Sequence, residues 1–342
     1  MILPDIFIFI GNMAKFLFIR FSSIGDIVLT TPLLRCLKKK MPEAKIHYIT
    51  KKQFAPLLIA NPYIDKLLVL ETSLPLTIKK LEEESYDYVI DLHNNLRSFI
   101  IKRKLKKPAF SFCKLNIKKW LLVQFKINLL PQKHIVDRYM DTLRFFGVNN
   151  DYAGLDYSIP PEEEIDTTLL VQKPYLALVT GANHQTKQLT REKMLELCNR
   201  ISYPVVLLGG EKEKAMGEYL QSKSRGEVLN FCGSLSINQS ASLIRQASVV
   251  VTPDTGLMHI AAAYKKDIIS VWGNTVPAFG MYPYLAGKRS LLMEINHLSC
   301  RPCSKLGFSR CPRKYFACIN AIDMDVIVNH AHEILHSSFT NL

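Results

Sequence analysis

The sequence predicts an α/β protein made of two consecutive Rossmann-like halves of similar size. Short apolar runs alternate with amphipathic stretches along most of the chain, which is the pattern of parallel strands joined by crossover helices. A Pro-rich, acidic stretch (IPPEEEID) without a regular period interrupts this alternation near the middle. The length of 342 residues is too great for one small core and fits two medium domains.

The first half, residues 13–150, is expected to be an N-terminal Rossmann-like domain. Its strands are predicted at 15–21, 46–50, 66–70 and 88–91. Its helices are predicted between the first strand and about residue 40, and at 53–60, 78–84 and 134–146. Gly147 follows the last helix and is a typical C-terminal cap.

The second half repeats the alternation after a linker at 151–173. Its strands are predicted at 175–180, 205–208, 248–252 and 268–272. Its helices are predicted from Arg191, from Glu211, at 237–246 and from Gly256. We expect a second Rossmann-like domain over 174–322 and a C-terminal helix over 323–342.

The chain is basic, and its positive charge is concentrated in one segment. The 44 Lys and Arg exceed the 30 Asp and Glu by 14, and 11 basic residues but no acidic one lie between Arg97 and Lys133. A solvated helix face is the simplest explanation. A stretch of 37 residues without a carboxylate favours contact with an anionic partner instead: nucleic acid, a phosphorylated substrate or a membrane surface.

The composition and the N-terminus narrow the class of protein further. The apolar fraction of 48% excludes disorder, and no apolar run reaches the ~18 residues of a membrane-spanning helix, so we expect a soluble folded chain. Residues 1–12 are apolar but lack the basic region and cleavage site of a secretory signal. Met13 is a natural start, so residues 1–12 are either an upstream mis-start or a short membrane-touching extension.

The turn after the first strand, FSSIGD, places Asp26 at the beginning of a helix. This turn lacks the GxGxxG pattern of dinucleotide binders, which disfavours a nicotinamide oxidoreductase. Asp26 either caps the helix and complements its dipole, or serves as a general base. Taken by itself, the turn favours the capping interpretation.

Two turns of the second half have the composition of an anion site. TGANHQTK ends a strand in a Gly-containing loop that leads to Lys187, although its Gly spacing is not that of a Walker motif. PDTGLMH leads from a buried strand into a helix whose first amides lack intrahelical partners. A tight capped turn explains Asp254 and Gly256 but not the adjacent His259, so a functional interpretation is favoured here.

A further polar turn, DLHNNLRS, ends the strand at 88–91 and opens the basic segment. Such a strand end could hold a hydroxylated or phosphorylated acceptor. The alternative is an ordinary capped helix.

Together and in this order, these motifs resemble glycosyltransferase family 9, the family of the lipopolysaccharide heptosyltransferases. The matching pieces span about residues 15–275 and include Arg20 to Asp26 with the following TTPLLRCLKKKMPEAKI, DLHNNLRS, HIVDRYMDTLRFFGV, TGANHQTKQL, and PDTGLMHIAAA leading to VWGNT. PDTGxxH is the most specific of them. The TK loop departs from the family pattern, because Leu189 and Thr190 replace its usual aromatic residue and Pro.

The resemblance implies a GT-B architecture, in which two Rossmann-like domains face each other across a cleft. The first would bind the acceptor and the second the nucleotide-sugar. The implied reaction is inverting sugar transfer without a catalytic metal or other cofactor. The donor would be ADP-heptose, although related folds use other nucleotide sugars, and the acceptor an anionic envelope glycolipid. The protein would then be cytoplasmic and would contact the inner membrane peripherally through the basic 97–133 stretch.

The resemblance also assigns roles to individual residues. Asp26 matches the proposed general base, and Lys187 matches the lysine that contacts the diphosphate. The rest of the donor set is Ala182, Asn183, Glu211, Asp254, Thr255, Gly256 and His259. The acceptor set is Ser23, Asp91, His93, Asn95 and Arg97.

Four of the eight cysteines lie within 19 residues: Cys300, Cys303, Cys311 and Cys318. In a reducing compartment such a cluster favours metal over disulfides, although the second pair is spaced too widely for a usual zinc ribbon. We therefore expect either a structural zinc or plain reduced thiols. The basic residues of this loop keep one alternative open, a nucleic-acid-binding protein with a metal module, although no nucleic-acid fold signature appears. A nucleotide-sugar epimerase is the second alternative.

Overall fold

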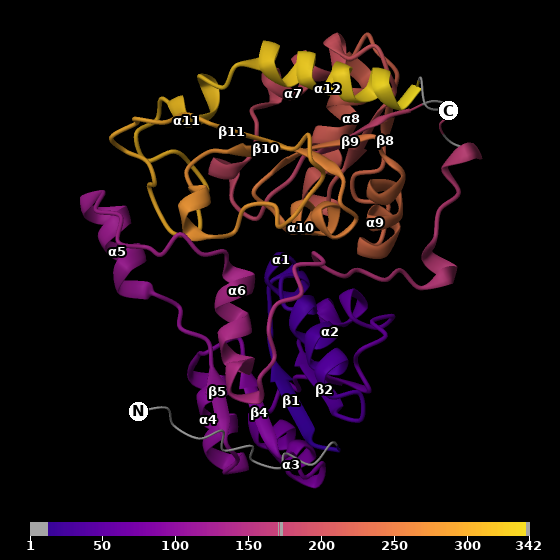
Figure 1. Ribbon diagram of the computed structural model, residues 1–342. Helices are drawn as coiled ribbons and strands as arrows, with labels where there is room; N and C mark the ends of the chain where they lie inside the picture. The colour runs from indigo at the N-terminus through magenta and orange to yellow at the C-terminus, as the bar shows by residue number, and fades with distance from the viewer. Residues whose placement is uncertain (1–12, 170, 172–173, 340–342) are drawn as a thin grey trace. The chain divides into compact units, whose positions relative to one another are not determined.

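The computed structural model describes residues 13–169, 171 and 174–339, and the interpretation of residues 1–12 lies outside these ranges (Figure 1). The chain divides into two compact units. Unit 1 contains the described residues up to Lys114 and then Val136–Asp151, and unit 2 contains Leu115–Ile135 and the residues from Tyr152 onward.

Unit 1 is built on a five-stranded parallel sheet in the order β3-β2-β1-β4-β5. The strands are β1 (Lys15–Ile19), β2 (Lys45–Thr50), β3 (Lys66–Val69), β4 (Tyr88–Asp91) and β5 (Ala109–Ser111). The helices are α1 (Ile24–Val28), α2 (Thr31–Lys40), α3 (Leu74–Glu83), α4 (Leu96–Leu105) and α6 (Ile135–Met140). The end of α6 continues as a 3-10 turn over Asp141–Phe146, which Gly147 closes at φ 67°.

The core of unit 1 forms around its central strand. Residues 16–19 of β1 are all fully buried, as expected for a parallel strand covered on both faces. On one face the ring of Phe146 packs edge-on against the rings of Phe16, Tyr88 and Phe110, with centroids 4.8–5.1 Å apart. This packing explains why the segment after α6 belongs to unit 1.

Unit 2 is built on a six-stranded parallel sheet in the order β11-β10-β9-β6-β7-β8. The strands are β6 (Leu176–Val179), β7 (Val205–Leu208), β8 (Val228–Asn230), β9 (Val249–Pro253), β10 (Asp267–Trp272) and β11 (Leu291–Glu294). The helices are α5 (Asn116–Phe125), α7 (Arg191–Arg200), α8 (Lys214–Lys223), α9 (Ile237–Gln246), α10 (Gly256–Ala263), α11 (Ala317–Asn320) and α12 (Met324–Phe339).

The helix α12 covers the β9–β10 part of this sheet beside α7. Its buried face includes Ile327, Ala331 and Ile334, each fully excluded from solvent. The C-terminal helix expected over 323–342 therefore packs into the core of unit 2.

The observed division differs from the expected one at residues 115–135. From the sequence, this segment was expected in the first domain because the alternation continues through it. In the structure the segment belongs to unit 2. The backbone N–H of Ile135 donates to the carbonyl of Gly280 at 2.8 Å, and Lys126 Nζ donates to the carbonyl of Pro302 at 2.8 Å. These bonds fasten the segment to unit 2.

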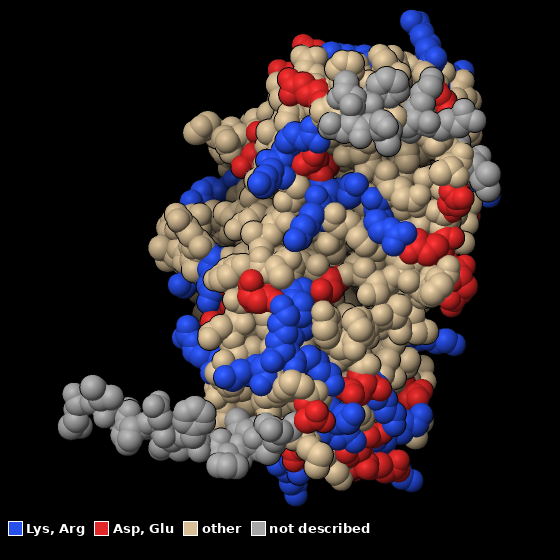
Figure 2. All heavy atoms as spheres, turned by 45° about the vertical axis from the view of Figure 1, so that its right-hand side comes forward, with Lys and Arg blue, Asp and Glu red and all other residues tan. Residues whose placement is uncertain are grey.

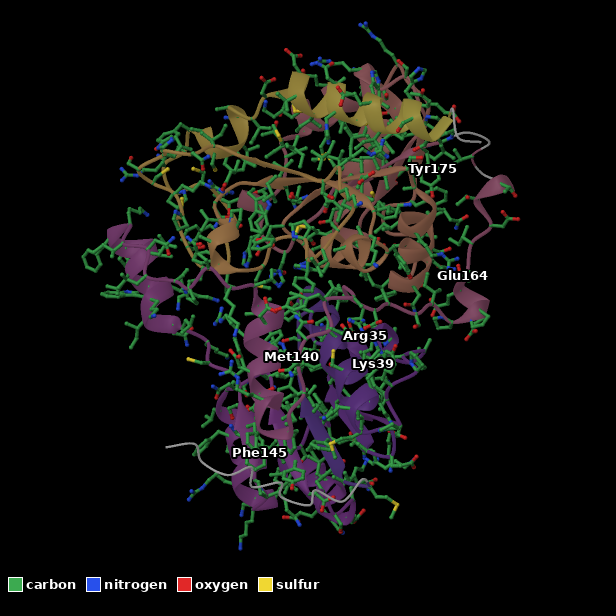
Figure 3. All side chains as sticks on the ribbon, viewed as in Figure 1. Arg35, Lys39, Met140, Phe145, Glu164 and Tyr175 are labelled. Atoms are coloured by element: carbon green, nitrogen blue, oxygen red, sulfur yellow. The ribbon has the colours of Figure 1, made fainter. Side chains whose placement is uncertain are left out.

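Several charged side chains elsewhere in unit 1 form ion pairs. Arg35 and Lys39 of α2, both labelled in Figure 3, reach the carboxylate of Asp151 at 2.9 and 2.6 Å. On the face of the molecule drawn in Figure 2, Lys and Arg side chains likewise stand among Asp and Glu side chains. Within the described ranges, no helix is both long enough and apolar enough to cross a membrane.

Candidate active site

The topology of each sheet marks one place for a ligand. In unit 1 the chain winds from β1 to β2 and β3 and then returns to β4 on the other side; in unit 2 it returns in the same way from β8 to β9. Ligands of open α/β sheets bind at such switch points, outside the carboxyl ends of the strands. The turns singled out in the sequence follow β1 and β4 in unit 1, and β6 and β9 in unit 2.

In the turn after β1, the two carboxylate oxygens of Asp26 have different partners. Oδ2 accepts from the hydroxyl of Ser23 at 2.8 Å and from its backbone N–H at 3.2 Å, which is the capping interaction. Oδ1 lies 2.6 Å from the guanidinium of Arg20 and 3.4 Å from the hydroxyl of Tyr139. The Asp26 side chain remains 20% exposed, so a ligand can still reach it.

The surroundings of Asp26 keep it ionised. Burial by itself would raise the pKa of this carboxyl group, but the Arg20 guanidinium and the Ser23 hydrogen bonds outweigh burial and lower the pKa below its ordinary 3.8. Arg20 is itself buried and donates further bonds to the carbonyls of Ser22 and Leu92. Arg20 and Tyr139 lie within matched motifs but were given no role from the sequence, because nothing in the turn indicates which side chains face Asp26.

The acceptor role expected for Asp91 does not agree with its position at the end of β4. Its side chain is fully buried, and its oxygens accept from the backbone N–H groups of His93 and Asn94, the hydroxyl of Ser98 and the ammonium of Lys102. All four distances lie between 2.7 and 3.0 Å. Asp91 therefore shapes the turn from inside and does not present an oxygen to a ligand.

The other residues of this turn differ in accessibility. Asn95 caps α4 by accepting from the Ser98 N–H at 3.0 Å. Arg97, and Ser23 of the turn after β1, are exposed to solvent. The His93 ring packs against Phe21 with centroids 4.9 Å apart. Burial lowers the pKa of His93 to about 4, with Arg20 and Lys114 adding to the effect, so this imidazole is neutral at physiological pH.

In unit 2 the structure brings together two motifs that lie 67 residues apart in the sequence. Lys187 Nζ lies 2.7 Å from Asp254 Oδ2, and the same oxygen accepts from the Thr275 hydroxyl at 2.9 Å. These residues follow β6, β9 and β10, which are neighbours in the sheet. The side chains of Lys187 and Asp254 remain 16% and 12% exposed. Thr275 was not predicted as a site residue, although its position in WGNT, just after a buried strand, is a signal for one.

The PDTG turn leads directly into α10. Thr255 precedes the helix with an extended backbone and makes no side-chain capping bond, so the first amides of α10 are not capped by it. His259 lies in the first turn of the helix and is 2% exposed. A helix N-terminus beside a lysine is well suited to hold negatively charged oxygens.

The remaining donor residues lie on the loops that follow β6 and β7. The carbonyl of Ala182 accepts from the Gln188 side chain at 2.9 Å, which holds the loop after β6 in a compact turn. Asn183 is exposed, and Glu211 is exposed at the start of a 3-10 turn after β7. The contacts of these three residues do not fix their role.

The Cys-rich segment supports the donor-side loops from outside. The buried Arg301 donates to the carbonyls of Gly273 and Thr275 at 2.7 and 2.8 Å and pairs with Glu294 at 2.6 Å. The backbone N–H of Phe308 donates to the Thr186 hydroxyl at 2.8 Å. The segment therefore positions Lys187 and Thr275 through their neighbours.

Of the two alternatives for Cys300, Cys303, Cys311 and Cys318, a structural zinc or reduced thiols, the zinc is not shown among the described residues. All four are free thiols, and across the described part of the chain no three His, Cys, Asp or Glu side chains gather in a way that could hold a metal ion. Burial raises the pKa of Cys303 to about 11, and the neighbouring Cys300 and Cys311 contribute to this.

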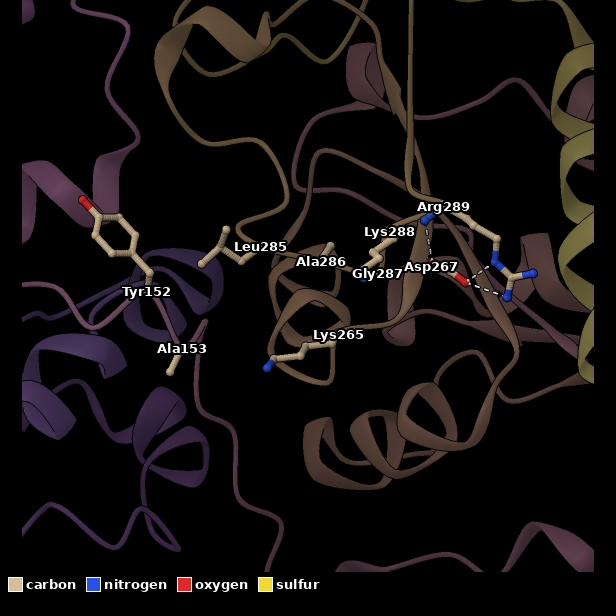
Figure 4. Close-up of a pocket in the computed structure, with 9 residues that line it drawn as sticks. All are labelled: Tyr152, Ala153, Lys265, Asp267, Leu285, Ala286, Gly287, Lys288 and Arg289. Atoms are coloured by element: carbon tan, nitrogen blue, oxygen red, sulfur yellow. Dashed lines mark hydrogen bonds and ion pairs between the residues drawn. The ribbon is translucent and has the colours of Figure 1, made fainter.

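A hollow of about 450 Å³ lies elsewhere in unit 2 (Figure 4). It is lined by nine residues that include Lys265 and Lys288, with the Asp267–Arg289 ion pair at its edge. Asp267 begins β10, whereas the donor-side turns follow the carboxyl ends of the strands. The hollow therefore opens at the opposite end of the sheet from Lys187 and is not part of the candidate site.

Two Rossmann-like units, each with a polar turn at its switch point, form a fold of GT-B type. A solved structure with this fold, a family 9 glycosyl transferase from Veillonella parvula, matches 95% of this chain and 98% of its own with a TM-score of 0.77 at 20% identity. A second, described as an Escherichia coli ADP-heptose lipopolysaccharide heptosyltransferase II, matches 95% of this chain and 99% of its own with a TM-score of 0.72 at 19% identity.

The sequence pattern of glycosyltransferase family 9 (heptosyltransferase) matches residues 76–307, and the chain belongs to this family. The curated relatives include lipooligosaccharide heptosyltransferase 2 of Haemophilus influenzae, which is 26% identical over 306 residues, or 80% of this chain and 87% of the relative. The resemblance noted in the sequence is thereby confirmed, and the protein is a glycosyltransferase. Neither the nucleic-acid-binding nor the epimerase alternative is supported.

Proposed function

We propose that the protein transfers heptose from ADP-heptose, with inversion, to an acceptor of the lipopolysaccharide type. The names of the matched relatives support this donor and this acceptor class. The observation that carries the proposal is the Lys187–Asp254–Thr275 cluster beside the N-terminus of α10, because this cluster is suited to a diphosphate.

On the donor side, Lys187 and the first amides of α10 would hold the diphosphate. Negative charge accumulates on the leaving ADP as its bond to the sugar breaks, and a fixed ammonium with helix-terminal amides stabilises that charge. Asp254 and Thr275 would position the Lys187 ammonium. His259 would support the turn from within the helix, and Ala182, Asn183 and Glu211 would border the nucleotide. This arrangement supplies the positive charge without requiring a metal ion.

On the acceptor side, Asp26 would act as the general base. It would take the proton of an acceptor hydroxyl while that oxygen attacks the anomeric carbon from the face opposite ADP, so the new glycosidic bond forms as the bond to ADP breaks. Ser23, His93 and Arg97 would contact the acceptor. Asp91 and Asn95 would position their turn, because both are engaged in internal hydrogen bonds.

Lipid-linked acceptors of this kind are made at a membrane, so we place the enzyme at the cytoplasmic face of the inner membrane, in peripheral contact. The acid-free 97–133 stretch supports this location, because basic residues are attracted to anionic headgroups. The stretch is shared between the units: α4 lies in unit 1 and α5 in unit 2. One of its lysines, Lys102, is paired with Asp91 and is not available for such contact.

Calorimetric titration with ADP, UDP, GDP and CMP, without magnesium, tests the donor assignment. We expect heat of binding with ADP alone, because the cluster recognises a diphosphate and the relatives' donor is an adenosine nucleotide. Selective binding of UDP or GDP would show that the donor carries that nucleotide and would leave the location of the donor site unchanged. No binding of any diphosphate would contradict the proposal.

The Arg20–Asp26 pair predicts a shift in the pH profile of transfer. In the wild type the ionised, active form of Asp26 persists down to below pH 3.8, because its folded pKa is lowered. In Arg20→Gln the effect of burial is no longer offset by the guanidinium, so the pKa of Asp26 rises. As the pH is lowered, the variant therefore loses activity earlier, at a higher pH than the wild type does. We expect the acidic limb to move up by about one to three pH units.

The control for this shift is Arg35→Gln. Arg35 is also a buried arginine of unit 1 with an aspartate partner, Asp151, but it does not contact Asp26. Its pH profile is expected to match that of the wild type. An unshifted acidic limb in folded Arg20→Gln would show that Asp26 ionisation does not limit turnover.

A further inference from the structure

The helix α5 turns apolar side chains toward solvent instead of toward the core. Ile117, Trp120 and Phe125 are 75%, 48% and 58% exposed, while Leu122 is the fully buried residue of the helix at 7%. With 3.6 residues per turn, Ile117, Trp120 and Leu121 share one face of the helix. Ile127 and Leu129, just after the helix, are also about half exposed. An apolar surface of this kind indicates an interaction site.

Two side-chain contacts tie α5 to the rest of unit 2. Lys126 Nζ, at its C-terminal end, donates to the carbonyl of Pro302 at 2.8 Å. Lys119, on the inner side, places its ammonium 5.8 Å from the centre of the Phe279 ring. The rings of Trp120 and Phe125 meet edge-to-face with centroids 5.3 Å apart. The outer side chains are therefore displayed by an anchored helix.

The charges around this face have one sign. No Asp or Glu occurs between Arg97 and Lys133, and Lys118 is exposed on α5 itself. The Cys-rich segment that Lys126 contacts is similar: residues 295–322 contain five Lys and Arg and no carboxylate. That segment also exposes Leu306 by 68% and Tyr315 by 52%. Two acid-free segments with exposed apolar side chains thus meet at the Lys126–Pro302 bond.

We propose that α5 is an interfacial membrane anchor, which inserts Ile117, Trp120 and Phe125 among the headgroups of a bilayer rich in anionic phospholipid. This deepens the peripheral contact of the proposed function and rests on it. Apolar and aromatic side chains enter the headgroup region, while flanking lysines extend to the phosphates. A purely electrostatic contact would not need the exposed Trp and Phe.

Charge complementarity selects this occupant over a second copy of the chain. In a symmetric dimer the same patch would face itself, which would bring lysines together without any carboxylate from the 97–133 stretch to neutralise them. An anionic bilayer supplies the missing negative charge along the whole face.

Tryptophan fluorescence gives a direct test. The chain has two Trp, and Trp272 is buried at 1% exposure, so a change of emission on adding vesicles reports on Trp120. The probes are vesicles of equal parts phosphatidylglycerol and phosphatidylcholine, compared with pure phosphatidylcholine. We expect a blue shift and vesicle sedimentation with the anionic vesicles, and a much weaker response with the neutral ones.

The double variant Ile117→Ser/Phe125→Ser keeps the reporter and removes its apolar neighbours. Its affinity for anionic vesicles is expected to fall at least about tenfold, given the apolar area each side chain would bury. The matched control, Ile59→Ser/Val326→Ser, removes two apolar side chains that are 67% and 42% exposed elsewhere and should bind like the wild type. ADP titration of each variant confirms that unit 2 is folded.

Three results would overturn the anchor. The double variant could bind as tightly as the wild type, or the protein could sediment with vesicles while Trp120 emission stays unchanged, as in purely electrostatic adsorption. A blue shift that depends on protein concentration without vesicles would assign the face to a second copy. Failure of the wild type to bind ADP would instead refute the ADP-heptose donor of the proposed function, and the vesicle result would still be interpretable.

Discussion

Replacing Asp26 with Asn is expected to reduce turnover about 10²–10⁴-fold, the usual contribution of a general base. The side-chain carbonyl of Asn can still accept the Ser23 bonds that cap α1, so the shape of the turn is kept. What is lost is the oxygen that faces Arg20 and would take the acceptor proton. Turnover is measured as ADP release in the presence of acceptor.

ADP affinity separates chemistry from folding in this variant. The donor cluster lies in unit 2 and Asp26 in unit 1, so ADP should bind to Asp26→Asn as it does to the wild type. The matched control is Asp151→Asn, because Asp151 is also a unit 1 carboxylate paired with arginine, and its turnover should be unaffected. Wild-type turnover in Asp26→Asn would remove Asp26 from the mechanism and leave it as a helix cap.

The central strands and the edge strand β3 could be predicted from the sequence, whereas the edge strands β5, β8 and β11 could not. Residues 88–91 and 205–208 form strands at the predicted positions, because buried parallel strands are short, continuous apolar runs. The edge strands β5, β8 and β11 carry intermediate or exposed residues, so no apolar run marks them. The helix predicted at 53–60 is a 3-10 turn with Pro56 inside it, because proline removes a backbone donor.

The positions of site residues could be predicted only where the residues directly follow neighbouring strands of one sheet. Lys187 and Asp254 follow neighbouring strands of one sheet, so their turns must lie close together once the topology is known. The burial of Asp91 and its bond to Lys102 depend on how α4 packs, which a local pattern does not encode. The same is true of Arg20, whose partners come from three different turns and helices.

The site residues also show why two interpretations of one motif can both hold. Oδ2 of Asp26 makes the capping bonds to Ser23, while Oδ1 faces Arg20, and the side chain as a whole remains 20% exposed. Capping fixes the direction of the carboxylate, and fixed direction is what a general base needs. Because the Arg20 guanidinium lowers the pKa of Asp26, the carboxylate is always ionised at neutral pH but only weakly basic. Proton transfer would therefore be completed late, as the acceptor oxygen bonds to the sugar.

Removing the ammonium of Lys187 is the second change with a large expected effect. Lys187→Ala should lower turnover about 10²–10³-fold, equivalent to about 2.7–4 kcal/mol of transition-state stabilisation, because one donor to the departing diphosphate is lost. ADP affinity should fall as well, since ground-state ADP carries the same phosphates. Asp254 keeps its bond from Thr275 in the variant, so the turn before α10 retains one of its two side-chain ties.

The control is Lys193→Ala, which removes another partly buried lysine of unit 2. The Lys193 ammonium lies on α7 and donates to the carbonyl of Ile322 at 2.7 Å, whereas the Lys187 ammonium pairs with Asp254. Both ADP affinity and turnover should survive this change, apart from any small loss of stability. If Lys187→Ala binds ADP as tightly as the wild type does, the diphosphate does not lie at the Lys187–Asp254 pair. The donor would then have to be sought at another strand end of the same sheet.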